Sequence, residues 1–98
     1  MTIHQATCDT YTEDARYANQ RCEVRIDGNF IAVSYVDNNG PAAYEGNEVS
    51  AGHFKLTGPN QGRASLHRFA NEEVLEGWWI ETRDGKRSEG MWRILLED

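Results

Sequence analysis

The sequence predicts an all-β protein: a small antiparallel meander that closes as a barrel or packs as a sandwich of six to eight short strands. Apolar and polar residues alternate along much of the chain, which is the pattern of strands with one face on a core. Clusters of Gly, Asn, Asp and Pro interrupt these runs about every ten residues, the spacing of a meander. Single glycines also fall inside the runs, and a strongly coiled sheet uses such glycines to bend, so the barrel is favoured over the sandwich.

The strongest local signal lies in residues 74–96, where one short pattern occurs twice. Glu76–Trp79 and Glu89–Trp92 both read Glu-Gly-x-Trp, and Asp84-Gly85 lies between them. Asp-Gly flanked by apolar, aromatic-rich runs predicts a β-hairpin with a two-residue turn.

The turn decides which residues of this hairpin face one another. With Asp84-Gly85 as the turn, Gly77 faces Trp92 and Gly90 faces Trp79, so that each indole lies over the bare backbone of a strand glycine. A four-residue loop over 84–87 would pair the two tryptophans instead and lose both matches. We therefore expect the two-residue turn.

This register gives the hairpin two apolar faces, with Glu76 opposite Arg93 as an opposite-charge pair on the second. The residues expected to face the core are Leu75, Trp79, Trp92, Ile94 and Leu96. The opposite face carries Val74, Trp78, Ile80, Met91 and Leu95. One small core cannot bury both faces, so either the N-terminal segment covers the second face or it is an exposed apolar patch.

An exposed patch of this composition predicts a surface for a partner protein or for a second copy of the chain. Trp, Met and Arg are enriched at the residues that dominate binding energy in interfaces. The expected partner-binding residues are Trp78, Ile80, Met91, Arg93 and Glu76.

The first 20 residues predict a different local structure. Thr2–Cys8 reads as a short edge strand. Thr10 and Glu13 have the spacing of a capping box, which predicts a short helix that ends near Asn19. Its apolar face is narrow, so we expect the helix to act as a lid over one end of the sheet; the residues of that face are Tyr11, Ala15 and Ala18.

The middle of the chain predicts the remaining strands and turns. Two of the strands form a hairpin about an Asp27-Gly28 turn, and residues 37–41 form a loop. The expected strands are Arg21–Ile26, Asn29–Val36, a short one within Ala42–Val49, Gly52–Thr57 with Phe54 and Leu56 inward, and Arg63–Phe69 with Ala64 and Leu66 on one face.

Composition predicts a single acidic domain over residues 1–98. The net charge is −6, the hydrophobic fraction is 39% and the mean hydropathy is −0.72. No apolar run approaches the roughly 18 residues of a membrane span, and the opening residues lack the features of a secretory signal, so we expect a cytoplasmic protein without a membrane partner. An acidic surface disfavours direct nucleic-acid binding, which needs a basic stripe.

The sequence offers no recognisable catalytic, metal or cofactor constellation, so we expect a protein that is not an enzyme and holds no cofactor. His4 and Cys8 have a ligand-like spacing, but Cys22 or His67 would have to complete a metal site from distant strands. Ser65 and His67 are neighbours on one strand face without a nucleophile motif. Free, buried thiols are the expected state of the two cysteines.

Three functions remain open on this basis. The leading hypothesis is a non-enzymatic acidic module that docks on another protein through the C-terminal hairpin. A second is an inhibitor whose carboxylates occupy a basic nucleic-acid-binding site on an enzyme. The carboxylates in question are Asp9, Glu13, Asp14, Asp27, Asp37, Glu45 and Glu48.

The third hypothesis is a small-molecule-binding barrel whose mouth is lined by Tyr35, Tyr44 and His53. With fewer than eight strands, however, the lumen would be filled by side chains. The residues expected to fill it are Trp79, Trp92, Phe30 and Phe54.

Overall fold

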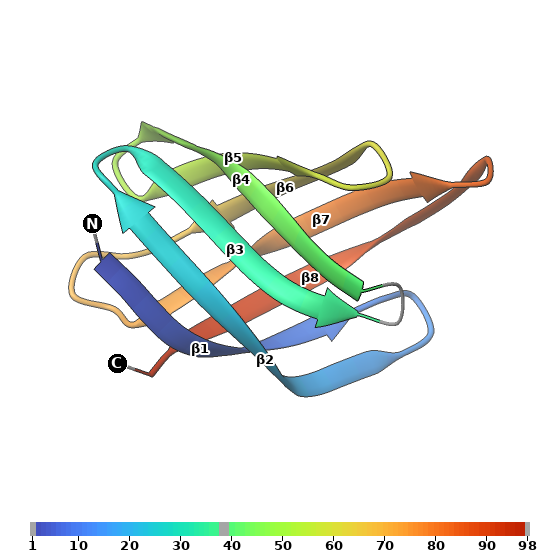
Figure 1. Ribbon diagram of the computed structural model, residues 1–98, viewed down its shortest axis with the longest axis horizontal. Helices are drawn as coiled ribbons and strands as arrows, with labels where there is room; N and C mark the ends of the chain where they lie inside the picture. The colour runs from blue at the N-terminus through green and yellow to red at the C-terminus, as the bar shows by residue number, and fades with distance from the viewer. Residues whose placement is uncertain (1, 38–39, 98) are drawn as a thin grey trace.

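The chain folds as a closed barrel of eight antiparallel strands in sequence order, with β8 pairing back on β1 (Figure 1). The computed structural model describes residues 2–37 and 40–97. The strands are β1 (Thr2–Tyr11), β2 (Arg16–Asp27), β3 (Phe30–Asp37), β4 (Gly40–Ser50), β5 (His53–Gly58), β6 (Gly62–His67), β7 (Val74–Arg83) and β8 (Lys86–Leu96). The all-β class and the barrel are confirmed.

Closure makes β1 a central strand, whereas the sequence predicted an edge strand. β1 pairs with β2 from Thr2↔Ile26 onward and with β8 from Ala6↔Leu96 to Thr10↔Trp92. The blue and red strands accordingly lie side by side in Figure 1. A closed barrel gives every strand two neighbours, which pairs both rows of backbone hydrogen-bonding groups wherever adjacent strands overlap.

The predicted N-terminal helix is wrong, and the structure has no helix in the residues that it describes. β1 continues through Tyr11, and Thr12 opens a tight turn instead of a helix. The Thr12 amide donates to the Ala15 carbonyl at 2.8 Å, and the Thr12 hydroxyl accepts the Ala15 amide at 3.0 Å. A hydroxyl that accepts from a backbone amide three residues on serves a hairpin turn as well as a helix cap. The apolar face of the expected helix is not buried, since Ala18 is exposed.

The register predicted for the C-terminal hairpin is confirmed. Gly77 pairs with Trp92 and Trp79 pairs with Gly90. Asp84 and Gly85 form the turn with φ angles of 53° and 76°. Positive φ at both central residues is typical of the type I′ turn, whose twist matches that of the strands.

The first predicted hairpin is also present, but its turn is displaced by one residue. Asp27 pairs with Phe30, so the turn residues are Gly28 and Asn29 rather than Asp27 and Gly28. Gly28 has a φ of 61° at the first turn position, where a two-residue turn of the II′ type needs glycine. Because the first turn position requires positive φ, Gly28 occupies it, and Asp27 is the last residue of β2.

The other elements match the prediction with altered ends. β4 is a full strand where only a short one was expected, β5 starts at His53, and β6 stops at His67, two residues before Phe69. Of the loop predicted over 37–41, residues 38–39 lie outside the described part, and Asp37 pairs with Gly40 at the end of the β3–β4 ladder.

The interior divides into two ends of different composition. Aliphatic side chains, with Phe54 at the start of β5, fill the end at which β1 begins and β8 stops. The other buried aromatic side chains and the two thiols occupy the half toward the β1–β2, β5–β6 and β7–β8 turns, which we call the mouth (right of Figure 1). Phe30 was expected inside, but it alternates with the inward Ile31 and Val33 and lies outside the core cluster. The large aliphatic residues that are fully buried are Val24, Ile31, Val33, Leu56, Leu66, Leu75 and Ile94.

Candidate functional site: an outer groove and a barrel mouth

The second face of the C-terminal hairpin is exposed. Trp78 is 46% exposed and Met91 55%, whereas Trp79 is only 9% exposed. β1 lies beside β8 in the sheet and does not cover this face. Of the two arrangements that the sequence left open, the structure therefore has the uncovered one. We define the outer hairpin face as the surface formed by Trp78, Ile80, Met91 and Leu95.

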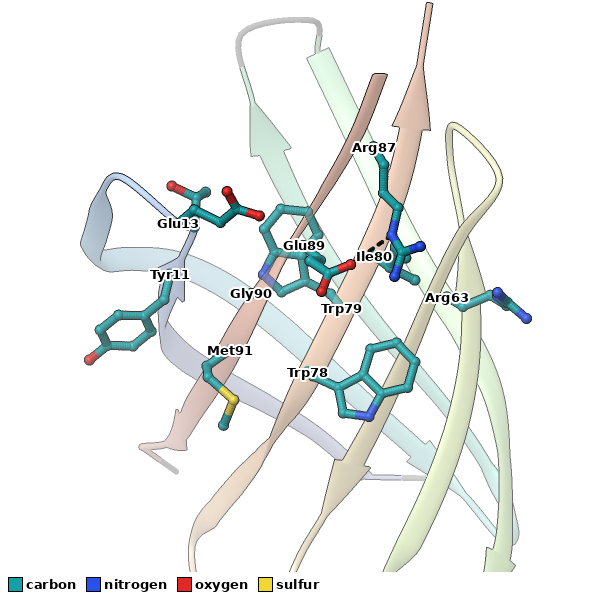
Figure 2. Close-up of a pocket in the computed structure, with 11 residues that line it drawn as sticks. Tyr11, Glu13, Arg63, Trp78, Trp79, Ile80, Arg87, Glu89, Gly90 and Met91 are labelled. Atoms are coloured by element: carbon teal, nitrogen blue, oxygen red, sulfur yellow. Dashed lines mark hydrogen bonds and ion pairs between the residues drawn. The ribbon is translucent and has the colours of Figure 1, made fainter. Parts of the chain in front are cut away.

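A groove of about 580 Å³ runs along this face (Figure 2). Three of the predicted partner-binding residues, Trp78, Ile80 and Met91, line it. Tyr11 at the end of β1 forms a further part of the wall. The Tyr11 carbonyl lies so close to Gly90 that a Cβ at position 90 would overlap it. Because glycine has no Cβ, the end of β1 can approach β8 at this point.

Charged side chains of both signs border the groove. Arg63 comes from β6 on one side, and Glu13 comes from the β1–β2 turn on the other (Figure 2). Between these two borders, Arg87 Nε and Glu89 Oε2 form an ion pair at a distance of 2.7 Å. The apolar floor thus has a basic border and an acidic border, with a paired charge in the middle.

The predicted site residues Glu76 and Arg93 lie outside this groove. They face each other across β7 and β8, as the register required, with Arg93 Nε 3.7 Å from Glu76 Oε1. Both side chains are more than half exposed. The pair therefore lies on the same side of the hairpin as the outer hairpin face but does not line the groove.

Sequence reasoning missed Tyr11, Glu13 and Arg63 as groove residues. Tyr11 and Glu13 were assigned to a helix, whereas a hairpin turn at Thr12 places Tyr11 beside Gly90 in the first half of β8. Arg63 could have been found from its pairing, because it lies directly opposite Ile80. The prediction considered the β7–β8 hairpin alone, whereas β6 and the end of β1 with its following turn also line the groove.

A second hollow, of about 480 Å³, opens at the mouth of the barrel. Tyr35 and Tyr44 line it, as the sequence predicted, together with Trp92 from β8. Their rings form one cluster: Tyr44 and Trp92 meet edge to face at 5.4 Å between centroids, and Tyr35 and Trp92 at 6.1 Å. Eight strands, rather than fewer, leave room for this cavity above the filled end of the core.

Glu81 is the central polar group of this cavity. The Tyr44 hydroxyl donates to Glu81 Oε2 at 2.5 Å, and the Asn60 side-chain amide donates to Glu81 Oε1 at 3.3 Å. The Tyr44 ring packs over the backbone of Gly58 and Gly62, where a Cβ would overlap the ring. The β5–β6 turn thereby fixes the tyrosine, and the tyrosine fixes the carboxylate.

Burial raises the pKa of Tyr44, and the hydrogen bond to Glu81 raises it further. Burial is also the main cause that raises the pKa of Tyr35, followed by the negative charges of Glu81 and Asp37. Both hydroxyls are therefore neutral hydrogen-bond donors at physiological pH.

The predicted mouth residue His53 lies elsewhere. It stands on the outer wall between β5 and β6, where its ring stacks on His67 at 4.2 Å between centroids. Its Nε2 is 2.8 Å from the Ser65 hydroxyl. Ser65 is only 8% exposed, so this contact ties two strands together and offers no accessible nucleophile.

Cys8 and Cys22 are free, buried thiols, as expected. Their hydrogen bond and their burial raise the pKa of the Cys22 thiol, which is therefore protonated. Among residues 2–37 and 40–97, no three His, Cys, Asp or Glu side chains are grouped so that they could hold a metal ion.

Comparison of the chain with protein-family models, with curated proteins and with solved structures found no match. In the described part of the chain there is also no helix with the length and apolar character that crossing a membrane requires.

Proposed function

We propose that the protein is a non-enzymatic binding module that docks on another protein through the groove and the outer hairpin face. The observation that carries this proposal is the exposure of Trp78 beside the buried Trp79 on the same strand. A tryptophan left half exposed next to Met91 and a groove has the chemistry of a binding hot spot.

Barrel closure limits how the partner can bind. Each strand has two neighbours in the ring, so sheet edges stay open only where one strand outruns its neighbour, as residues 86–91 of β8 do toward β1. The groove itself is lined by side chains, and we expect the partner to engage them. We therefore expect a helix or loop that inserts an apolar residue between Trp78 and Met91 and sets charges against Arg63 on one border and Glu13 on the other.

Capture from a lysate of the source organism tests this proposal with matched variants. Trp78→Ala should reduce the affinity for the captured protein by ~30-fold or more. Phe69→Ala, which truncates an aromatic residue that is 77% exposed in the β6–β7 loop, should leave it unchanged. Melting curves should show both variants folded with at most a small loss of stability, because the outer face contributes little to the fold. Equal capture by the wild type and Trp78→Ala would contradict the proposal.

A second copy of the chain is the alternative occupant of the same face. A basic border and an acidic border on opposite sides can satisfy each other across a two-fold axis. Sedimentation at several concentrations separates the two cases. If the wild type is a dimer and Trp78→Ala dissociates it, the partner is another copy of the chain. If the wild type is a monomer, the partner is a different protein.

The barrel mouth supports a second candidate function, the binding of a small molecule. A cavity of about 480 Å³ with an aromatic floor and a rim that includes the charged Asp37, Glu81 and Arg83 falls within the usual volume range of ligand sites. The indole N–H of Trp79 is buried there without an acceptor among the described residues, and that of Trp92 has only the sulfur of Cys8, a weak acceptor, beside it. Such local conflicts lower stability by about 1–3 kcal/mol each and are found mostly at functional sites. A thermal-shift screen tests this candidate, since a ligand of the native state raises the melting temperature.

The inhibitor hypothesis receives less support from the geometry. Its carboxylates are divided between the two ends of the barrel: Glu13 and Asp14 lie in a mouth turn, while Asp27 and Glu48 lie at the opposite end. A mimic of nucleic acid presents its charges along one line. Steep weakening of partner binding with added salt would favour this hypothesis over docking through the outer hairpin face.

A further inference from the structure

We propose that the mouth of the barrel binds a small organic cation, namely an amine or quaternary ammonium group on a compact apolar body. This inference rests on the second candidate function, small-molecule binding at the mouth. It concerns a site inside the barrel and does not depend on what docks on the outer groove.

The aromatic floor is the first part of the argument. Tyr35, Tyr44 and Trp92 come from three strands and meet with their rings stacked or edge to face, at 5.4–6.5 Å between centroids. All three rings line the cavity, and the electron-rich face of an aromatic ring attracts a cation within about 6 Å of its centroid. The rings also supply the apolar surface that a methylated ammonium group needs.

The electric field of the cavity is the second part. Glu81 and Asp37 line the mouth, and Arg83 is the one basic residue among the lining side chains that the structure describes. The negative charges of Glu81 and Asp37 raise the pKa of Tyr35, which means that they oppose a negative charge at its hydroxyl. A field that penalises a negative charge at this point favours a positive charge there.

Glu81 has the capacity to take a further donor. Its two oxygens each accept one hydrogen bond from the chain, from Tyr44 and from Asn60. An ionised carboxylate has about four acceptor positions, so an ammonium group can bind beside the two existing donors. Because the Tyr44 ring is held by Gly58 and Gly62, the carboxylate is already oriented before the ligand arrives.

Arg83 is the competing feature. It is exposed on β7, and its charge acts against that of Glu81 at the Tyr35 hydroxyl, although it is the smallest of the named influences there. If Arg83 governed the site, the cavity would prefer an anion. The two interpretations therefore predict opposite charge preferences for ligands of one shape.

A matched series of probes tests the proposal on the intact protein. Choline, its neutral carbon isostere neohexyl alcohol and the tert-butylacetate anion share one compact, branched shape and differ in charge. We expect choline to bind at least about fivefold more tightly than the neutral alcohol by calorimetry. In NMR spectra, the indole N–H signals of Trp79 and Trp92 should shift on binding while that of Trp78 stays in place.

Variants assign the preference to the named charges. Glu81→Gln should lower the affinity for choline to that of neohexyl alcohol and leave the alcohol unaffected, and Asp37→Asn should lower it by a smaller factor. Arg83→Gln should raise the affinity for choline, and Trp78→Ala should change nothing at this site. Melting temperatures of the variants confirm that they fold; if Glu81→Gln unfolds, Asp37→Asn and Arg83→Gln carry the test.

Two results would overturn the inference in distinguishable ways. Equal binding of the alcohol, or tighter binding of the anion, would refute the cation preference and leave small-molecule binding at the mouth intact. The absence of binding by all three probes at about 10 mM, well above the Kd range of useful ligands, would overturn both the inference and the second candidate function. Neither result bears on docking at the outer groove.

Discussion

The two faces of the β7–β8 hairpin differ sharply although the same strands carry them. Trp79 points into the barrel and is 9% exposed, whereas its neighbour Trp78 points outward and is 46% exposed. Leu75 and Leu95 repeat the contrast, the first fully buried and the second 42% exposed. The inward residues account for the fold. The outward ones contribute little to it, and that surplus of apolar surface is the main reason to propose a binding partner.

The largest expected effect separates the two tryptophans by stability. Trp79→Ala removes a buried indole and should lower the free energy of unfolding by about 3–5 kcal/mol. Trp78→Ala should lower it by less than ~1 kcal/mol, because water already covers much of that side chain. Urea denaturation followed by circular dichroism measures both. Similar losses for the two variants would mean that Trp78 belongs to the core and that the outer hairpin face is not free.

Gly90 provides the next test, because it lies where the inner face meets β1. A Cβ at this position would overlap the Tyr11 carbonyl, so Gly90→Ala must push β1 away from β8. We expect a loss of about 3 kcal/mol in the free energy of unfolding. Gly85→Asn is the control: Gly85 has a φ of 76° but open space around it, and Asn tolerates that conformation, so ~1 kcal/mol or less should be lost. If Gly90→Ala is as mild as the control, the close approach of β1 is not needed for closure.

How far the sequence could predict this structure depends on the range of the interactions. The Glu-Gly-x-Trp repeat and Asp84-Gly85 determined the hairpin register correctly, because turn type and cross-strand pairing are local. The role of Gly90 differs from the prediction: a Cβ at this position would meet the backbone of Tyr11, so the glycine accommodates β1. Nothing near it in sequence indicates that contact.

The N-terminal error has the same origin. Residues 10–19 have a weak helical pattern, and weak propensity yields to tertiary pairing. Here β8 needed a partner to close the barrel, and β1 supplied it through Thr10↔Trp92. Tyr35 and Tyr44 were correctly expected at the mouth, but the lumen was expected to be filled by side chains, because that expectation assumed fewer than eight strands when part of the first 20 residues was assigned to a helix.

Alkaline pH should weaken the mouth end selectively. The pKa values of Tyr35 and Tyr44 are raised in the folded protein, while an unfolded tyrosine titrates near pH 10. Above about pH 10 the unfolded chain loses protons that the native state keeps, so stability falls as pH rises, by at most about 1.4 kcal/mol per pH unit for each tyrosine.

Tyr44→Phe isolates one of these two groups. At neutral pH the variant should be less stable by about 1–3 kcal/mol, since it loses the hydrogen bond to Glu81, a charged acceptor. Above pH 10 its stability should fall less steeply than that of the wild type, and the two curves should converge. Urea denaturation at several pH values measures this difference. Parallel curves would show that Tyr44 titrates normally and is not held by burial and Glu81.

The smallest expected effect concerns the ion pair on the outer face. Glu76 and Arg93 face each other at 3.7 Å, but both side chains are more than half exposed, and water screens such pairs. Arg93→Ala and Glu76→Ala should each change the free energy of unfolding by ~0.5 kcal/mol or less. In a double-mutant cycle, their coupling should be a few tenths of a kcal/mol and should vanish in 1 M salt, where screening acts within about 3 Å. A coupling above ~1 kcal/mol would mean that this face is more enclosed than its exposure indicates, and Trp78 would then lose the contrast with Trp79 on which the docking proposal depends.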